Sequence, residues 1–204
     1  MGLFDRFTNP DKRGTERGFG LMIRPPTMDD FQQWAALRSE SRDFLVPWEP
    51  KWADDDLTRS AYRRRYFNDS DPDFLHPYFI FEEKMGTLLG GISFGHVRRG
   101  VAQSAMMGYW MGQRHSGKGI MTHAVPLALR QAFGPLGFRR IEAGCIPRNT
   151  ASIRVLENNN FIREGYAREY LCIAGIWEDH VIYARLKADK GPAFANPPAS
   201  QIGR

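Results

Sequence analysis

The segment GQRHSGKGIMTHAV, residues 112–125, constrains the fold of this chain more than any other part of the sequence. Gly117 and Gly119 alternate with polar residues, and apolar residues at helical spacing follow them. A glycine-rich turn of this kind joins a strand to the N-terminus of a helix, where backbone N–H groups without a helical partner attract anions. The segment therefore predicts an α/β chain with an anion-binding turn.

An ATP-binding P-loop is the first interpretation of this turn. Counted from Gly112, the segment is G-x-x-x-x-G-K-G, but a P-loop has Ser or Thr where Gly119 stands. The missing hydroxyl removes a magnesium ligand. The strand before the turn also carries Tyr109 and Trp110 instead of a purely apolar run. Both features argue against an ATP site.

A pyrophosphate bound without a metal is the second interpretation, and a plain strand-to-helix turn is the third. Gly117 and Gly119 let the backbone approach a bulky anion, and the N–H groups of residues 117–121 would point at it. Arg114 and Lys118 add positive charge. Such a turn suits coenzyme A, whose phosphates need to be held but not activated.

The order of the other elements places this turn in a mixed sheet. Helices are expected at 27–38, 54–69, 118–133 and 149–160, and strands at 76–83, 88–97, 103–111, 139–145, 161–171 and 176–186. Pro126 predicts a local kink in the third helix, because proline removes a backbone hydrogen bond. We expect one α/β domain over residues 19–188, with flexible segments at 1–18 and 189–204.

Composition limits the class of protein and its surroundings. The chain has 204 residues, enough for one domain, and no apolar run approaches the ~18 residues that span a bilayer. We therefore expect no membrane association. The two cysteines, Cys145 and Cys172, lack metal-ligand spacing, so we expect no metal site, and the cytoplasm is the expected compartment. The net charge of +5 fits nucleic acid, ribosome or an anionic cofactor as partner. Arg63, Arg64 and Arg65 are either a solvated helix face or a ribosome or RNA contact.

The order of the motifs resembles the core of the GNAT acetyltransferases: a strand, R-x-x-G-x-G, a helix, a strand, and then N-x-x-S-x-x-V-L-E. Further stretches are similar to the RimJ/RimL-like branch, which acetylates the N-terminal alanine of a ribosomal protein. They are FLVPWEP at 44–50, VRRG at 97–100, GQRHSGKGIM at 112–121, RIEAGCIPRNTAS at 140–152, REGYAREYLCIAGIWEDH at 163–180 and the final Gly203-Arg204. One departure is Asn159-Asn160-Phe161 in place of the usual L-G-F, and asparagine is the next-best residue after glycine for a left-handed helix end.

The resemblance implies a GNAT fold, with a mostly antiparallel central sheet flanked by helices, and acetyl-CoA as cosubstrate without a metal. A backbone N–H near Met111 would stabilise the oxyanion, and splayed strands around 104–111 and 139–145 would admit the pantetheine arm. The cofactor contacts would come from Met111, Gln113, Arg114, Ser116, Gly117, Lys118, Gly119, Ile120, Met121, Asn149 and Ser152.

Two residues are the candidates for catalysis. Ser152 lies where this branch of the family has the proton donor to the leaving sulfur, although an ordinary serine in a first helical turn fits its context equally. Asn149, three residues earlier, could contact the cofactor, cap the helix, or do both. Glu169 is the candidate general base, and a solvated strand carboxylate is the alternative, because the register of its strand is uncertain by one residue.

The acceptor amine would contact further residues. Trp48 and Glu49 could supply a wall and an anionic partner for an ammonium group, although the prolines beside them also fit a structural turn. Tyr109 could be a wall or an acid, or could only pack. Glu142 and Asp179 are fallback candidates for the base.

These observations lead to three hypotheses of function. The first is acetyl-CoA-dependent N-acetylation of a protein N-terminus, with the alanine of a ribosomal protein as expected target and possible association with the ribosome. The second keeps the cosubstrate but takes a small amine as acceptor: a polyamine, an aminoglycoside or an amino acid. The third is a basic ribosome- or RNA-associated protein that holds coenzyme A with little turnover, without sequence-specific recognition of nucleic acid.

Overall fold

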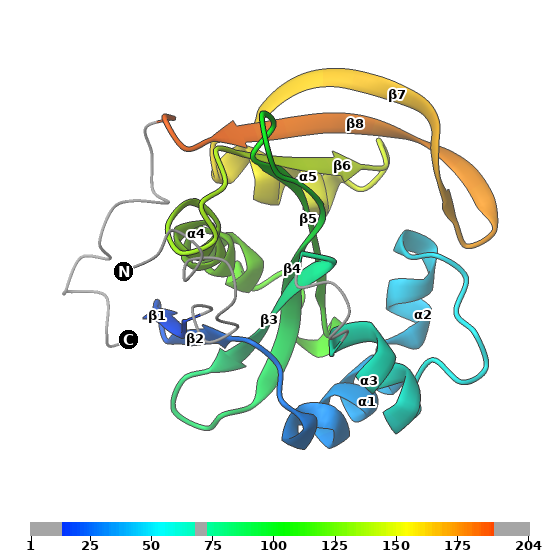
Figure 1. Cartoon of the computed structure of the whole chain (residues 1–204). Coiled ribbons are helices and arrows are strands. Elements are labelled where there is room, and N and C mark those ends of the chain that lie inside the picture. The colour runs from blue at the N-terminus through cyan, green and yellow to red at the C-terminus, as the bar shows by residue number, and fades with distance from the viewer. Residues whose placement is uncertain (1–13, 68–72, 190–204) are drawn as a thin grey trace.

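A mixed β-sheet forms the centre of the molecule (Figure 1). The computed structural model describes residues 14–67 and 73–189, and within them the sheet has eight strands in the order β1-β2-β3-β4-β5-β6-β8-β7. The strands are β1 Glu16–Gly18, β2 Leu21–Arg24, β3 Leu75–Glu82, β4 Leu88–Arg98, β5 Ser104–Met111, β6 Arg140–Cys145, β7 Ile162–Ile173 and β8 Ile176–Leu186. β5 and β6 are parallel, and the other neighbours are antiparallel. The expected mixed, mostly antiparallel sheet is thus confirmed.

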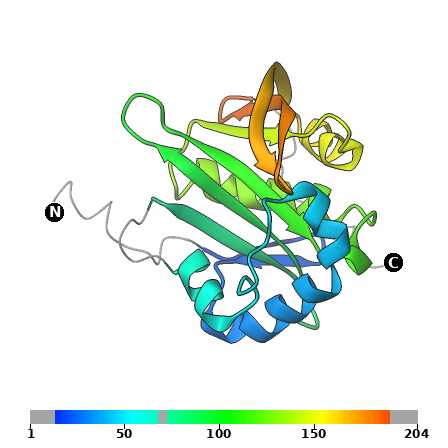
Figure 2. The same ribbon diagram turned by 90° about the vertical axis from the view of Figure 1, so that its right-hand side faces the viewer.

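Helices cover both faces of this sheet (Figures 1 and 2). The helices α4, Ile120–Phe133, and α5, Thr150–Asn158, pack on one face in the larger apolar cluster. On the other face, α1, Phe31–Glu40, and α3, Arg59–Tyr66, form a second cluster with β3 and β4. Short helices complete the set: η3 Met28–Asp30, α2 Arg42–Leu45, η4 Val46–Trp48 and η5 Gln113–His115.

The ends of the elements show where the sequence patterns failed. The second expected helix, 54–69, is shorter, because Thr58 caps α3 by accepting a hydrogen bond from the Ala61 N–H at 3.2 Å. The strands β1 and β2 were not expected, since three or four residues are too few to show alternation. Residues 14–18 were expected to be flexible, yet Glu16 lies in β1 and pairs with Arg130 of α4 at 2.9 Å. Residues 1–13 and 190–204 lie outside the described ranges.

The helix α4 continues through Pro126, and Asn159, the residue directly after α5, donates to the carbonyl that this proline leaves without its helical donor. In an unbroken helix, the carbonyl of Thr122 would accept from the N–H at position 126. Instead, the side-chain amide of Asn159 donates to the Thr122 carbonyl at 3.2 Å and to the Val155 carbonyl at 2.8 Å. Asn159 is only 1% exposed, and Asn160 beside it has a left-handed φ of +57°. Asn159 therefore compensates for the hydrogen bond that Pro126 cannot make.

We expect Asn159→Ala to destabilise the wild-type protein more than a Pro126→Ala variant. In the wild type the substitution leaves the carbonyl of the half-buried Thr122 without this donor, which costs about 1 kcal/mol. In the Pro126→Ala background the new N–H at position 126 supplies the bond. A double-mutant cycle by urea denaturation measures this coupling, and equal losses in the two backgrounds would show that the residues are independent.

Candidate active site

The turn between β5 and α4 has the backbone shape that its glycines suggested. Gly117 and Gly119 both have a φ of +73°, a left-handed conformation that other residues adopt only with strain. A Cβ at either position would meet nothing within 4 Å. The backbone of the turn is therefore open to a ligand, and the first N–H groups of α4 follow directly.

Contacts from α1 and the residue after it fix this turn in place. The Gln113 N–H donates to the buried Ser41 hydroxyl at 2.9 Å, and the Arg114 guanidinium lies 3.3 Å from the Glu40 carboxylate. Burial, with the charges of Arg114 and Lys118, lowers the pKa of His115, so this imidazole is neutral at pH 7. The turn thus presents two exposed cations beside a helix N-terminus, which fits a pyrophosphate.

The two parallel strands leave each other soon after they meet. Pairing between β5 and β6 joins Ser104–Met106 to Arg140–Glu142 and goes no further, although β5 continues to Met111 and β6 to Cys145. Met111 pairs with Gly90 of β4 instead. The strands therefore separate toward the glycine turn and toward α5, as the resemblance implied.

Ser152 lies in a small polar cluster beside these separating strands. Its Oγ is 2.7 Å from the hydroxyl of Tyr109 on β5 and 3.0 Å from Sγ of Cys145, the last residue of β6. The Tyr109 hydroxyl also lies 3.1 Å from the Ser152 carbonyl oxygen. Asn149 caps α5 by accepting from the Ser152 N–H at 3.1 Å, so the capping role, one of its three alternatives, is confirmed. Burial raises the pKa of Tyr109 and of Cys145, and both groups stay protonated.

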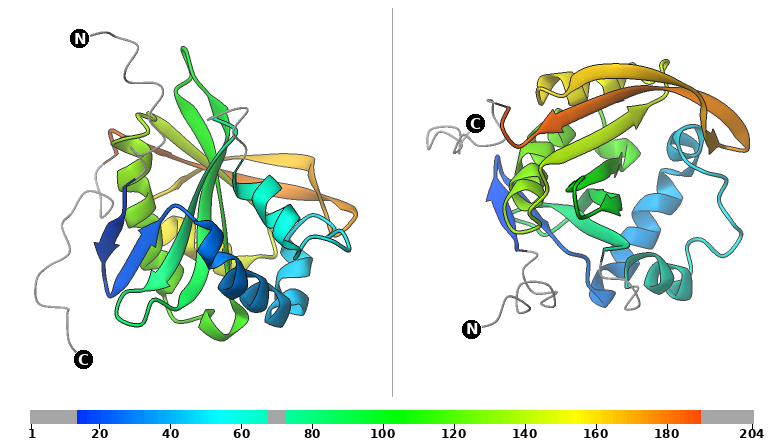
Figure 3. Two further views of the ribbon diagram at one scale, coloured as in Figure 1. Left: turned by 60° about the horizontal axis from the view of Figure 1, so that its bottom comes forward. Right: turned by 45° about the horizontal axis from the view of Figure 1, so that its top comes forward.

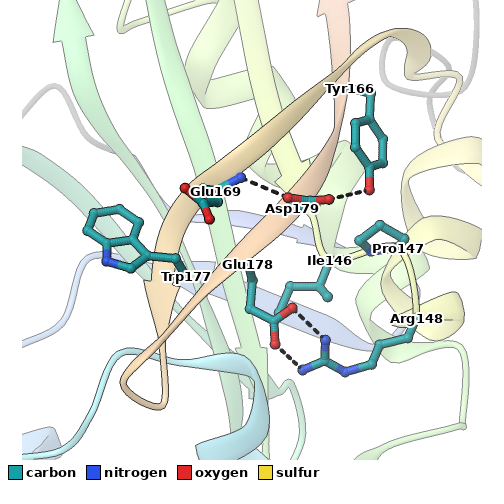
Figure 4. A pocket seen from close by; sticks show the side chains of 8 residues that line it. All are labelled: Ile146, Pro147, Arg148, Tyr166, Glu169, Trp177, Glu178 and Asp179. Atoms are coloured by element: carbon teal, nitrogen blue, oxygen red, sulfur yellow. Dashed lines mark hydrogen bonds and ion pairs between the residues drawn. The ribbon is translucent and has the colours of Figure 1, made fainter.

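Glu169 lies in a bulge of β7. Ala167 pairs with His180 and Leu171 with Glu178, so three residues of β7 stand opposite Asp179 alone. The φ of Glu169 is +45°. Its N–H donates to Asp179 Oδ1 at 2.8 Å, and Figure 4 shows the two residues side by side. The bulge breaks the alternation of the strand, which is why the sequence left the direction of Glu169 open.

An open pocket of about 380 Å³ contains Glu169 (Figure 4). One part of its lining is the segment 146–148, which leads from β6 into α5, and its other residues come from β7 and β8. The full lining is Ile146, Pro147, Arg148, Tyr166, Glu169, Trp177, Glu178 and Asp179. The pocket therefore brings Glu169 and Asp179 to the segment that precedes the helix of Ser152.

The three carboxylates of this pocket differ in how far their charge is balanced by a partner. Glu178 pairs with Arg148 at 2.7 Å, and that guanidinium lowers the pKa of Glu178. Two hydrogen bonds lower the pKa of Asp179: the larger effect comes from the Tyr166 hydroxyl, which donates at 2.7 Å, and the smaller from the Glu169 N–H. Among the described residues, no cation lies within ion-pair distance of the Glu169 carboxylate. The pocket thus has negative charge to offer an ammonium group.

Six of the lining residues were missed by the sequence analysis: Ile146, Pro147, Arg148, Tyr166, Trp177 and Glu178. The aromatic residues Tyr166 and Trp177 are more than half exposed, at 52% and 62%. Exposed aromatic side chains on a hairpin indicate a binding surface. This signal can be recognised only when the pairing register of the two strands is known.

The helices α1, α2, η4 and α3 together form a helical lobe beside the sheet. The loop around η4 reaches the pocket from this lobe. The Trp48 ring lies 5.6 Å from the Arg148 guanidinium of the pocket. Figure 3 shows the far end of the β7–β8 hairpin over α2, where the Ala174 N–H donates to the Glu49 carbonyl at 2.9 Å. Trp48 is thus near the pocket, and Glu49 joins the hairpin to the helical lobe.

The Glu49 carboxylate is held inside the lobe. It pairs with Arg38 at 2.5 Å and accepts the Trp52 indole N–H at 2.8 Å. Arg38 is 3% exposed, and its guanidinium lies over the rings of Trp34, Trp52 and Trp110 at 5.8, 4.5 and 5.1 Å. The charge of Glu49 is therefore balanced by a buried arginine, which favours the structural alternative for this residue.

Other charged candidates also have partners elsewhere. Glu142 pairs with Arg98 and with Arg140, the latter at 2.8 Å, and it is not among the residues that line the pocket. In α3, Arg64 lies 2.7 Å from Asp55 and Arg65 lies 3.9 Å from Asp56. These pairs favour a solvated helix face for that basic run.

We expect Glu49→Gln to lower the free energy of unfolding by about 2 kcal/mol, because it leaves the buried Arg38 charge without its counterion. The matched control is Glu83→Gln, whose partner Arg17 is 56% exposed and whose loss changes stability by less than about 0.5 kcal/mol. Thermal and urea unfolding measure both variants. Similar losses in the two would contradict a structural role for the Arg38–Glu49 pair.

Among the described residues, no helix is long and apolar enough to cross a membrane, and no group of three metal-ligating side chains is present.

Comparisons with known proteins agree with this geometry. Residues 20–162 match the model of the acetyltransferase (GNAT) domain. The chain is 39% identical over 176 residues to "Probable N-acetyltransferase YjcK" of Bacillus subtilis, an alignment that covers 85% of this chain and 97% of that protein. It is 33% identical over 177 residues to the [ribosomal protein uS5]-alanine N-acetyltransferase of Escherichia coli, covering 84% and 90%.

Solved structures give the same result. The ribosomal-protein-S5-alanine acetyltransferase from Vibrio fischeri superposes with a TM-score of 0.79 at 27% identity, covering 88% of this chain and 100% of that one. Mycobacterium smegmatis RimJ in complex with CoA-disulfide gives a TM-score of 0.77 at 29% identity, covering 85% and 86%. With an open glycine turn at the N-terminus of α4, diverging central strands and this similarity over most of its length, the chain belongs to the GNAT family of acetyl-CoA-dependent N-acetyltransferases.

Proposed function

We propose that this protein acetylates the N-terminal α-amino group of a protein, with the alanine of a ribosomal protein as its target in the cytoplasm. The observation that carries the proposal is the pocket that holds Glu169 and Asp179 beside the segment leading into Ser152. A base and a proton donor would then lie on the two sides of one reacting centre. Relatives named as ribosomal-protein-alanine acetyltransferases support the choice of acceptor.

The glycine turn and the start of α5 are suited to hold acetyl-CoA, which supplies the acetyl group as a thioester. The N–H groups of residues 117–121 would bind the pyrophosphate at the N-terminus of α4, with Arg114 and Lys118 as cations. Gln113, Ser116 and Met111 would line the path to the reacting centre, with the Met111 N–H as oxyanion donor, and Asn149 would close it at α5. The separation of β5 from β6 beyond Met106 supports this route.

Two side chains would move protons during the transfer. Glu169 accepts a proton from the attacking nitrogen, directly or through water, as the carbon–nitrogen bond forms. Ser152 gives its hydroxyl proton to the leaving sulfur as the carbon–sulfur bond breaks. Water returns a proton from Glu169 to Ser152, so both residues end as they began.

The acceptor needs only modest help from the base. An α-amino group has a pKa of about 7.7–8.0, whereas a lysine amine has a pKa of about 10.4. A large fraction of α-amino groups is thus already neutral near pH 7.5. The exposed Glu169 side chain, in an open pocket, suits this easier proton transfer and a chain end that enters from solvent, with Trp48 and Asp179 at its sides.

A small polyamine is the second candidate acceptor. Three carboxylates line the pocket, and Arg148 balances one of them, so a second positive charge on the acceptor would be accommodated. The hypothesis of a ribosome- or RNA-binding protein with little turnover has less support, because two arginines of α3 pair with nearby aspartates.

We expect thiol release from acetyl-CoA with short peptides that begin with free Ala or Ser, and none with acetyl-blocked peptides. Ser152→Ala should lower kcat by about 10²-fold and Glu169→Gln by less, within the range of general acid–base catalysis. Glu164→Gln is the control, because Glu164 lies on the same strand outside the pocket and pairs with Arg140. Turnover on polyamines or aminoglycosides alone would move the acceptor to small amines.

A substitution in the glycine turn tests the cosubstrate site. Gly119→Ala should raise the dissociation constant for acetyl-CoA about 10-fold, because a left-handed alanine costs about 1–2 kcal/mol and shifts the N–H groups of the turn. Gly137→Ala is the control, with a φ of +72° and equally open surroundings outside the site. Titration calorimetry measures both, and equal weakening by the two variants would show a general loss of stability.

A further inference from the structure

The cluster of Tyr109, Ser152 and Cys145 contains more hydrogen-bonding groups than a lone serine donor requires. Ser152 Oγ lies 2.7 Å from the Tyr109 hydroxyl and 3.0 Å from Cys145 Sγ. These two neighbours come from different strands, β5 and β6, at the place where the strands have separated. Ser152 itself lies on α5. Three elements therefore converge on one hydroxyl group.

The direction of these hydrogen bonds decides what Ser152 can do. A serine hydroxyl donates one hydrogen bond and accepts two. If Ser152 donated to Tyr109, its only proton would be turned away from the leaving sulfur. If Tyr109 and Cys145 both donate to Ser152 Oγ, the two acceptor positions are filled and the serine proton must point elsewhere.

Distance and protonation favour the second arrangement. The Tyr109 hydroxyl is closer to Ser152 Oγ, at 2.7 Å, than to the Ser152 carbonyl, at 3.1 Å. Burial keeps Tyr109 and Cys145 protonated by raising the pKa of each. The same raised pKa makes Tyr109 a poor source of a proton for transfer. It is suited to orient another group and to remain neutral.

We infer that Tyr109 and Cys145 are positioning residues, which donate to Ser152 Oγ and thereby aim its hydroxyl proton at the leaving sulfur. This inference rests on the role proposed for Ser152. It separates Tyr109 from the acceptor wall and from direct acid catalysis, and it gives Cys145 a role in the reaction without any bond to substrate.

Tyr109→Phe should lower kcat between about 3- and 10-fold, the effect of one neutral hydrogen bond, while both KM values stay within about 2-fold. In a Ser152→Ala background the same substitution should have no further effect, because the group it orients is gone. Titration with acetyl-CoA should give the wild-type dissociation constant for Tyr109→Phe, which shows that the fold and the cosubstrate site are intact.

Tyr183→Phe is the matched control. Tyr183 of β8 is buried, and its hydroxyl donates at 3.0 Å to Glu157 of α5, the helix that carries Ser152. Its removal should leave kcat unchanged, so a loss specific to Tyr109→Phe cannot be a general effect of removing a tyrosine hydroxyl next to α5. For the second donor, Cys145→Ser keeps a donor and should retain more activity than Cys145→Ala.

The remaining outcomes would overturn the inference. A further loss of kcat from Tyr109→Phe in the Ser152→Ala background would make Tyr109 the proton donor itself. An unchanged kcat for Tyr109→Phe in the wild type would leave it a packing residue. If Ser152→Ala alone has no effect while Glu169→Gln still lowers kcat, the proposed acetyl transfer stands, but the role of Ser152 and this inference both fail.

Discussion

The short parallel ladder between β5 and β6 is the constraint on which the rest of the site depends. Three residue pairs hold the two strands together, and afterwards each follows a different neighbour: Met111 pairs with Gly90 of β4, and Cys145 pairs with Val181 of β8. The sheet stays continuous while its centre opens. A hydrogen bond from one strand to the helix that follows the other, between Tyr109 and Ser152, crosses the opening. The chain thus gains a site between strands without losing a common core.

Much of this arrangement could be predicted from the sequence, and the rest could not for identifiable reasons. The glycine turn, α4 and the hairpin follow from local patterns, because Gly117, Gly119 and the apolar spacing act within a few residues of themselves. The place of Ser152 came from the resemblance, and the structure adds its partners. The direction of Glu169 could not be predicted, because a three-residue bulge opposite Asp179 breaks the period of two on which register arguments depend.

Carboxylates were the least predictable part of the site. Glu49, Glu142 and Glu169 look alike in the sequence, but their roles depend on which arginine side chains the fold turns toward each of them. Glu49 forms an ion pair with Arg38, whose guanidinium lies over tryptophan rings, and Glu142 forms ion pairs with Arg98 and Arg140. Glu169 stays exposed in an open pocket. Pairing of charges in the folded chain thus decided which acids remain available for chemistry.

The bond from Asn159 to the Thr122 carbonyl across from Pro126 has a consequence for how this sequence can change over time. A mutation of the asparagine alone leaves a carbonyl without a donor, whereas a mutation of the proline alone makes the asparagine dispensable at that carbonyl. The order of replacement therefore matters. A lineage that loses the proline first can later lose the asparagine, while the reverse order passes through a less stable protein. The two residues thus favour one order of replacement over the other.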